Sequence, residues 1–154
     1  MLKLEYKIKP DHSLFEQIKK DIILKLNFDS KDFVHDIEMA LCELVENSIK
    51  YCPTENLNND IEIQISLTNF SVKISVSNYY IDNDDFKTVI NTIDKIKNSA
   101  NSKNLYIERI NEIIKQKNHG KSQMGLYRIA FEGECTLDYK IKKDILTIYV
   151  EKKI

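Results

Sequence analysis

The sequence predicts an α+β fold, in the form of a two-layer α/β sandwich in which helices cover one face of a mixed sheet. Segments of alternating apolar and polar residues lie near the start, in the middle and at the end of the chain. Such alternation is typical of strands with one buried face. Between them, apolar residues recur at helical spacing. With 154 residues and 42% hydrophobic content, the chain is long enough for one core, so we expect residues 1–154 to form a single domain.

The first two predicted elements are a strand and a helix. Residues 2–8 alternate and predict a half-buried strand that ends before Pro10. Ser13 and Glu16 have the spacing of a capping box, which predicts that a helix begins there. The apolar face of this helix comprises Leu14, Ile18, Ile22 and Leu26.

A longer helix and a hairpin follow. Asp29 or Ser30 is a suitable N-cap for the helix, and Pro53 ends it. Residues 61–67 and 72–76 alternate and predict two strands joined by a turn.

The second half of the chain repeats both patterns. Helical periodicity returns in residues 86–96 and 105–114, and a short helix is predicted around 124–131. Two final strands are predicted over roughly 134–141 and 145–151.

The most informative segment is the polar edge of the long helix. At about 100° per residue, Glu43, Asn47 and Lys50 fall within about 60° of one another, at the border of the apolar face. An amide oxygen can bind a hard cation, a carboxylate can accept a proton from water, and an ammonium can bind a phosphate. The alternative is an amphipathic helix whose border positions happen to be polar.

This pattern resembles the N-box of the histidine-kinase-like (GHKL) ATPases, in which a Glu precedes an Asn by four residues and a Lys or His can follow it by three. The predicted order of strands and helices is also that of a histidine-kinase-type ATPase domain. By this resemblance, Asn47 would coordinate Mg²⁺ through the nucleotide, Glu43 would act as general base or polarise water, and Lys50 would approach the phosphates. ATP and Mg²⁺ are the cofactors that the resemblance implies.

The adenine-binding motif of that family is altered in this chain. Asn78 stands where the family has the Asp that contacts the adenine amino group, and it can still accept a hydrogen bond. Tyr80 stands at the first glycine position, where its ring is expected to crowd a nucleotide. An ordinary strand end followed by a turn is the alternative reading of Asn78, Tyr79 and Tyr80.

The phosphate-binding glycine motif is retained in part. Gly125 and Leu126 match its end, whereas Gln123 replaces the preceding glycine. Lys121 and Arg128 make this segment basic, which suits an anion at a helix N-terminus. The resemblance therefore assigns Lys121, Gly125 and Leu126 to nucleotide binding; the alternative is a loop before a helix, with Gly125 needed for close packing.

Residues 82–119 correspond to the flexible lid that closes over ATP in the family. Here they carry two amphipathic helical patterns, and a helical hairpin in which the two apolar faces pack together is the simplest account. These faces could also receive a protein partner or a second copy of the chain. Helices in place of a mobile loop imply altered nucleotide handling.

Composition excludes several other classes. A net charge of −1 gives no reason to expect nucleic acid. No apolar run approaches the roughly 20 residues that cross a bilayer, and the N-terminus lacks the apolar core of a signal peptide. Cys42, Cys52 and Cys135 contain no CxxC pair and read as reduced thiols, which favours a cytoplasmic protein without membrane contact.

Three functions compete. The first is a divergent GHKL-type domain that acts as a regulatory module in bacterial signalling, with nucleotide binding weak or lost and a protein partner in the pathway. It resembles the small stand-alone anti-sigma serine kinases. The second is an active ATP-dependent serine/threonine kinase of that type. The third is an interaction module without any ligand. We favour the first; a homodimer is left open.

Overall fold

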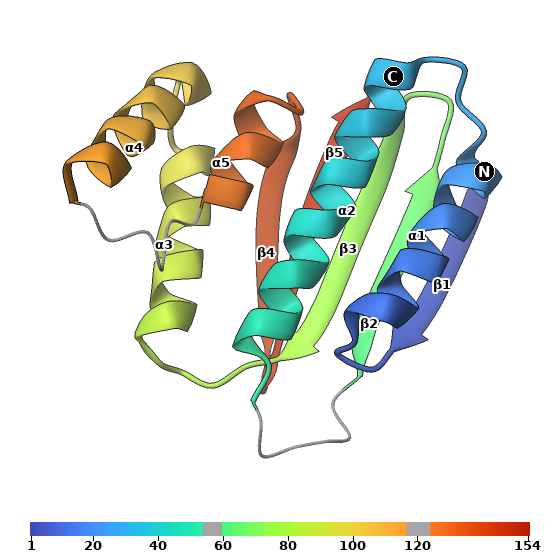
Figure 1. Cartoon of the computed structure of the whole chain (residues 1–154), viewed down its shortest axis with the longest axis horizontal. Coiled ribbons are helices and arrows are strands. Elements are labelled where there is room, and N and C mark those ends of the chain that lie inside the picture. Colours follow the sequence, from blue (N-terminus) through green and yellow to red (C-terminus); the bar gives the residue numbers. More distant parts are fainter. Residues whose placement is uncertain (54–59, 117–123) are drawn as a thin grey trace.

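The computed structural model describes residues 1–53, 60–116 and 124–154. Within these residues the chain forms an α+β fold with a five-stranded sheet on one side and helices on the other (Figure 1). The elements in chain order are β1 (Leu2–Ile8), α1 (His12–Leu26), α2 (Lys31–Tyr51), β2 (Ile61–Leu67), β3 (Ser71–Tyr79), α3 (Asp84–Lys97), α4 (Ser102–Gln116), α5 (Met124–Phe131), β4 (Thr136–Lys142) and β5 (Ile145–Lys153).

The strand order is β1-β2-β3-β5-β4, and each neighbouring pair is antiparallel. The prediction of a mixed sheet is therefore wrong. Figure 1 shows the reason at the β1–β2 pair, because α1 and α2 run in opposite directions between the two strands. When one helix connects two neighbouring strands, the second strand runs parallel to the first. When two antiparallel helices connect them, as α1 and α2 do here, the second strand runs antiparallel to the first.

The helices lie on one face of the sheet, as predicted (Figure 1). Along β2, β3 and β5 most inward side chains are buried and the outward ones are more exposed, which is usual for an antiparallel sheet with one solvated face. On the edge strands β1 and β4 most inward side chains are only partly buried or exposed. The row that crosses the middle of the outer face consists of Glu5, Gln64, Ser75, Tyr149 and Asp138.

α2 is the central helix of the core. Its residues Ile37, Leu41 and Leu44 are fully buried, as are Ile63 and Ile74 on the sheet beneath the helices. Each such side chain contributes roughly 1.5–3 kcal/mol relative to an exposed one. This packing holds α2 firmly, so the polar residues on its border have fixed positions.

The helix ends differ in detail from the prediction. α1 is capped by Asp11, whose carboxylate accepts hydrogen bonds from the backbone N–H groups of Ser13 and Leu14. Ser13 is therefore not the cap, and it instead donates its hydroxyl to Asp11 at 2.7 Å. For α2 the cap is Ser30, one of the two predicted candidates.

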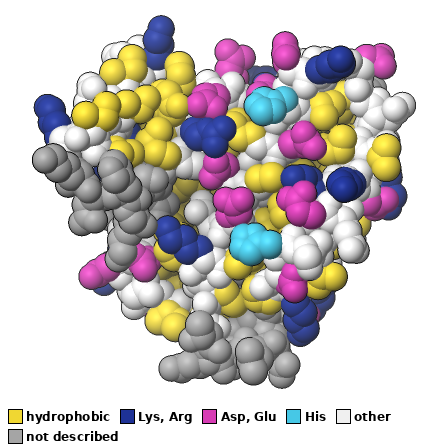
Figure 2. Space-filling model, viewed as in Figure 1, with side chains coloured by type: hydrophobic (Ala, Val, Ile, Leu, Met, Phe, Trp, Pro, Cys, Tyr) yellow, Lys and Arg dark blue, Asp and Glu magenta, His cyan; other side chains and the backbone are white. Residues whose placement is uncertain are grey.

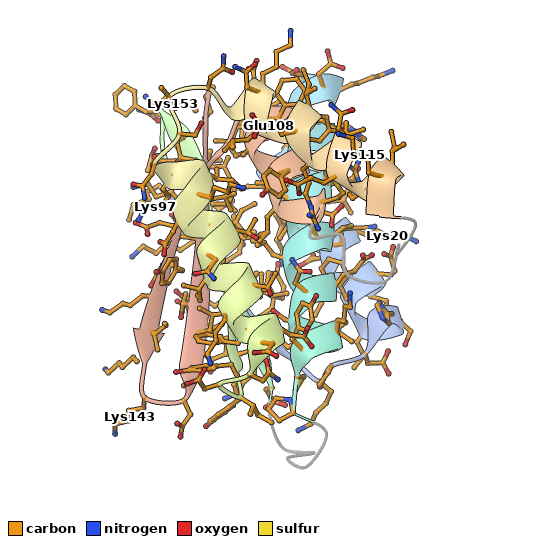
Figure 3. The ribbon with its side chains drawn as sticks, turned by 90° about the vertical axis from the view of Figure 1, so that its left-hand side faces the viewer. Lys20, Lys97, Glu108, Lys115, Lys143 and Lys153 are labelled. Atoms are coloured by element: carbon orange, nitrogen blue, oxygen red, sulfur yellow. The ribbon has the colours of Figure 1, made fainter. Side chains whose placement is uncertain are left out.

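The two helices predicted within residues 82–119 are present as α3 and α4, and residues 117–119 lie outside the described part of the chain. The predicted hairpin is wrong, since α3 packs mainly on β4 while α4 packs on α5. Lys97 of α3 binds Asp138 of β4 at 2.6 Å, and Figure 3 shows Lys97 beside this strand. Tyr106 of α4 packs on Phe131 of α5, with ring centroids 4.7 Å apart. The two helices therefore pack on different neighbours, α3 on β4 and α4 on α5.

Candidate functional site

The predicted site residues come from three elements. Glu43, Asn47 and Lys50 lie on α2, Asn78 lies near the end of β3, and the predicted phosphate-binding residues lie at the start of α5. Lys121 lies outside the described residues. The structure brings these residues together in two places rather than one: Glu43 meets α5, and Asn47 shares a small hollow with Asn78.

Glu43 is held by α5. Its Oε1 accepts a hydrogen bond of 2.8 Å from Nη1 of Arg128, and only 20% of its side chain is exposed. Burial raises the pKa of the Glu43 carboxyl above its usual value, and the nearby Arg128 opposes this rise. The carboxylate is thus paired with a guanidinium, and Glu43 and Arg128 both line an open hollow of about 360 Å³.

Gly125 allows this close approach between α5 and α2. A Cβ atom at position 125 would collide with Oε2 of Glu43 and lie 2.7 Å from its Cδ. Any side chain there would displace the carboxylate. The glycine that resembles the family's phosphate-binding residue therefore has a packing function in this structure.

The Glu43 ion pair continues into α4. Arg128 also donates from Nε to Oε2 of Glu132 at 3.1 Å, and the Tyr106 hydroxyl donates to Oε1 of Glu132 at 2.6 Å. This hydrogen bond lowers the pKa of Glu132. A continuous chain of charged and polar groups thus links Tyr106 of α4 to Glu43 of α2.

Asn78 is buried, with 7% of its surface exposed, and its amide is used internally. Oδ1 lies 3.0 Å from the Ser48 hydroxyl of α2, and Nδ2 donates to the Tyr79 carbonyl oxygen at 2.7 Å. The Ser48 hydroxyl also lies 3.0 Å from the Leu44 carbonyl oxygen. The amide that would contact adenine is therefore bound to the protein itself.

The aromatic rings of Tyr80 and Phe86 close the space beside Asn78. They are stacked with centroids 4.1 Å apart and an interplanar angle of 14°. The Tyr80 hydroxyl donates to the Lys143 carbonyl oxygen at 3.2 Å, which fixes the ring further. The remaining hollow has a volume of about 30 Å³ and is lined by Asn47, Asn78, Tyr80 and Phe86, among others.

An adenine ring does not fit this arrangement. A volume of about 30 Å³ is enough for one water molecule, whereas ligand pockets hold roughly 300–1,000 Å³.

Among the other predicted residues, Leu126 is fully buried in the core, and Lys50 Nζ lies 5.2 Å from the ring centre of Tyr51.

Several partners in these contacts were not identified from the sequence. The sequence places Arg128 only in a basic segment, and it gives no function to Ser48. Phe86 was assigned to a helix face without its stacking partner. A serine in an otherwise apolar helical face was the one signal for a buried polar contact.

The described residues offer few other sites. They contain no cluster of three His, Cys, Asp or Glu side chains arranged to hold a metal ion. Cys135 is buried, and burial raises its pKa to about 11, so its thiol is protonated and inert. No described helix has both the length and the apolar content to cross a membrane.

No protein-family model matches the chain, and no curated protein matches it either.

Proposed function

We propose that the chain is a divergent histidine-kinase-like ATPase domain that acts as a regulatory module in bacterial signalling and has weak or no nucleotide binding. The family assignment rests on the N-box pattern of the sequence and on the order of strands and helices. The observation that carries the loss of nucleotide binding is the Tyr80–Phe86 stack beside Asn78.

At the adenine end, two features work against a base. The rings of Tyr80 and Phe86 occupy the space, and the Asn78 amide already has partners at Ser48 and Tyr79. A nucleotide would have to displace the stack and break a buried hydrogen bond, which costs roughly 1–3 kcal/mol for each polar group left unpaired. This cost supports weak binding.

At the phosphate end, the candidate general base is already occupied. Glu43 is paired with Arg128 and is covered by the first turn of α5 at Gly125. A general base must reach the proton that it removes. The arrangement therefore favours the regulatory function over the alternative of an active serine/threonine kinase.

The lid region offers a surface for a partner. Ile107 and Ile114 of α4 are 45% and 68% exposed, and no described residue of this helix is classed as buried. Figure 2 shows hydrophobic side chains gathered over α4 at the upper left of the molecule. Such a patch is typical of a protein contact surface. It supports a function that depends on binding rather than on turnover.

Calorimetric titration with Mg·ATP and Mg·ADP tests this proposal, with Asn47→Ala as the control variant. We expect either no binding or binding no tighter than about 1 mM, so that little or no heat is released at nucleotide concentrations below this value. Micromolar binding that disappears in Asn47→Ala would overturn the proposal and favour the kinase. Equal binding by both proteins would also overturn it and would place the nucleotide away from the N-box.

A further inference from the structure

The strand β1 has an unpaired edge. It lies at the end of the strand order and pairs only with β2. In Figure 1 it is the outermost strand on its side, and no described element lies beyond it. Its seven residues contain no proline. Such an edge can accept another strand.

The opposite edge of the sheet is protected. β4 is flanked by α3, through the Lys97–Asp138 ion pair at 2.6 Å and the hydrogen bond from Tyr139 to Asp94 at 3.2 Å. A partner strand would have to remove this helix. Of the two edges, β1 is therefore the accessible one in the described part of the chain.

The outward charges of β1 are only partly matched by β2. Lys7 lies opposite Glu62 and forms an ion pair of 3.3 Å with it. Lys3 and Glu5 instead lie opposite the uncharged Ser66 and Gln64. Within the described residues, neither Lys3 nor Glu5 has an ion-pair partner.

We propose that a second copy of this chain binds the β1 edge, so that two β1 strands pair antiparallel around a two-fold axis at Leu4. This register places each Lys3 opposite Glu5 of the other copy, which matches the two charges that β2 leaves unmatched. On the inner side, Leu4 lies opposite Leu4 and Leu2 lies opposite Tyr6. These three apolar residues are now only partly buried, and the pairing covers them.

Other registers fit less well. A register shifted by one residue would place the apolar residues of one copy opposite the charged residues of the other copy. The register centred on Glu5 would place Glu5 opposite Glu5 and Lys3 opposite Lys7. The register centred on Tyr6 would place Lys3 opposite Lys9 and would use Lys7, which already holds Glu62. Charge matching therefore selects the register at Leu4.

The resulting dimer has one continuous sheet with an isologous interface, as expected for a symmetric pair. Two short strands bury less than the roughly 1,200 Å² of a stable complex, so we expect association in the micromolar range. The β1 edge lies at the far side of the sheet from α4 (Figure 1), so dimerisation leaves the apolar surface of α4 open.

Sedimentation velocity over about 5–500 μM protein tests this proposal. We expect a concentration-dependent dimer for the wild type and at least about tenfold weaker association for both Lys3→Glu and Glu5→Lys, because each faces like charges across the axis. Lys140→Glu is the matched control, since it reverses a lysine on β4 of the same outer face, and it should associate like the wild type. Circular dichroism verifies the fold of each variant.

Mixing the two variants gives the sharpest result. Lys3→Glu and Glu5→Lys should form a heterodimer with wild-type affinity, because both cross-strand pairs regain opposite charges, and the double variant should dimerise with itself. The proposal is overturned by a wild type that stays monomeric, which would leave the edge to a strand of a different protein. It is also overturned if both single variants associate as strongly as the wild type.

Discussion

The carboxylate of Glu43 and the backbone of Gly125 lie so close together that no side chain fits between them. The contact joins α2 to the first turn of α5, and Arg128, one turn further along α5, binds the same carboxylate at 2.8 Å. The two conspicuous motifs of the sequence thus meet, and at their meeting point they form a packed ion pair.

Gly125→Ala should lower stability by about 1–3 kcal/mol, because the new methyl group displaces Glu43 from Arg128. The loss should be smaller when Glu43 is already Ala. Urea unfolding of the wild type, both single variants and the double variant measures this coupling. Strictly additive effects would show that the two residues do not interact as described.

Glu43 and Glu132 should respond to pH in opposite directions. Burial raises the pKa of Glu43 in the folded protein. The contribution of Glu43 to stability is therefore fully present below the usual carboxyl pKa, and it is lost as the pH rises through the pKa that Glu43 has in the folded protein. The Tyr106 hydroxyl lowers the pKa of Glu132, so its contribution is present above the usual carboxyl pKa and is lost as pH falls through the folded value.

Urea unfolding between about pH 3 and 7 checks this prediction with Glu43→Gln and Glu132→Gln. The advantage of the wild type over Glu43→Gln should shrink as pH rises, and its advantage over Glu132→Gln should shrink as pH falls. Parallel slopes for the two variants would contradict the assigned pKa directions.

Lys152 should contribute strongly to stability through the contact that it makes between β5 and α2. Its ammonium binds Asp36 at 2.9 Å and donates to the Gly133 carbonyl oxygen at 2.7 Å, with 11% of the side chain exposed. Lys152→Ala should cost about 3–5 kcal/mol, because it leaves a carboxylate that is largely buried without a partner.

Lys73→Ala is the matched control for this loss. Lys73 also lies on a strand and pairs with a glutamate, but its side chain is 59% exposed. Removing an exposed pair costs about 0–1 kcal/mol. Thermal unfolding of both variants gives the comparison, and similar losses would mean that burial does not decide the effect.

The sequence predicted most elements because each has a clear local period. The hairpin of β2 and β3 and the helix α2 follow from alternation and from helical spacing. The mixed sheet was predicted wrongly, since a local pattern does not specify which strands become neighbours or in which direction they run.

The contacts of the candidate site likewise do not follow from local sequence patterns. The sequence predicts that the Tyr80 ring crowds a nucleotide, but the stacking of this ring on Phe86 depends on how α3 leaves β3. Arg128 lies 85 residues from Glu43. No periodicity in the chain indicates a pair so distant, and only the packing of α5 on α2 creates it.

Removal of the blocking ring should improve nucleotide binding. Tyr80→Ala eliminates one half of the stack with Phe86 and enlarges the hollow beside Asn78. We expect measurable Mg·ATP binding by calorimetry in this variant. Tyr79→Ala is the control, because Tyr79 is exposed and does not line the hollow. Identical behaviour of the two variants would mean that the ring is not what closes the site.

The most direct test of the central claim is a titration of ¹⁵N-labelled wild-type protein with Mg·ATP, followed by the backbone amide resonances of Ser48, Asn78 and Tyr80. We predict that these resonances do not move at nucleotide concentrations up to about 5 mM. Saturable shifts confined to these three residues would contradict it, because they would place a nucleotide base in the space that Tyr80 and Phe86 fill.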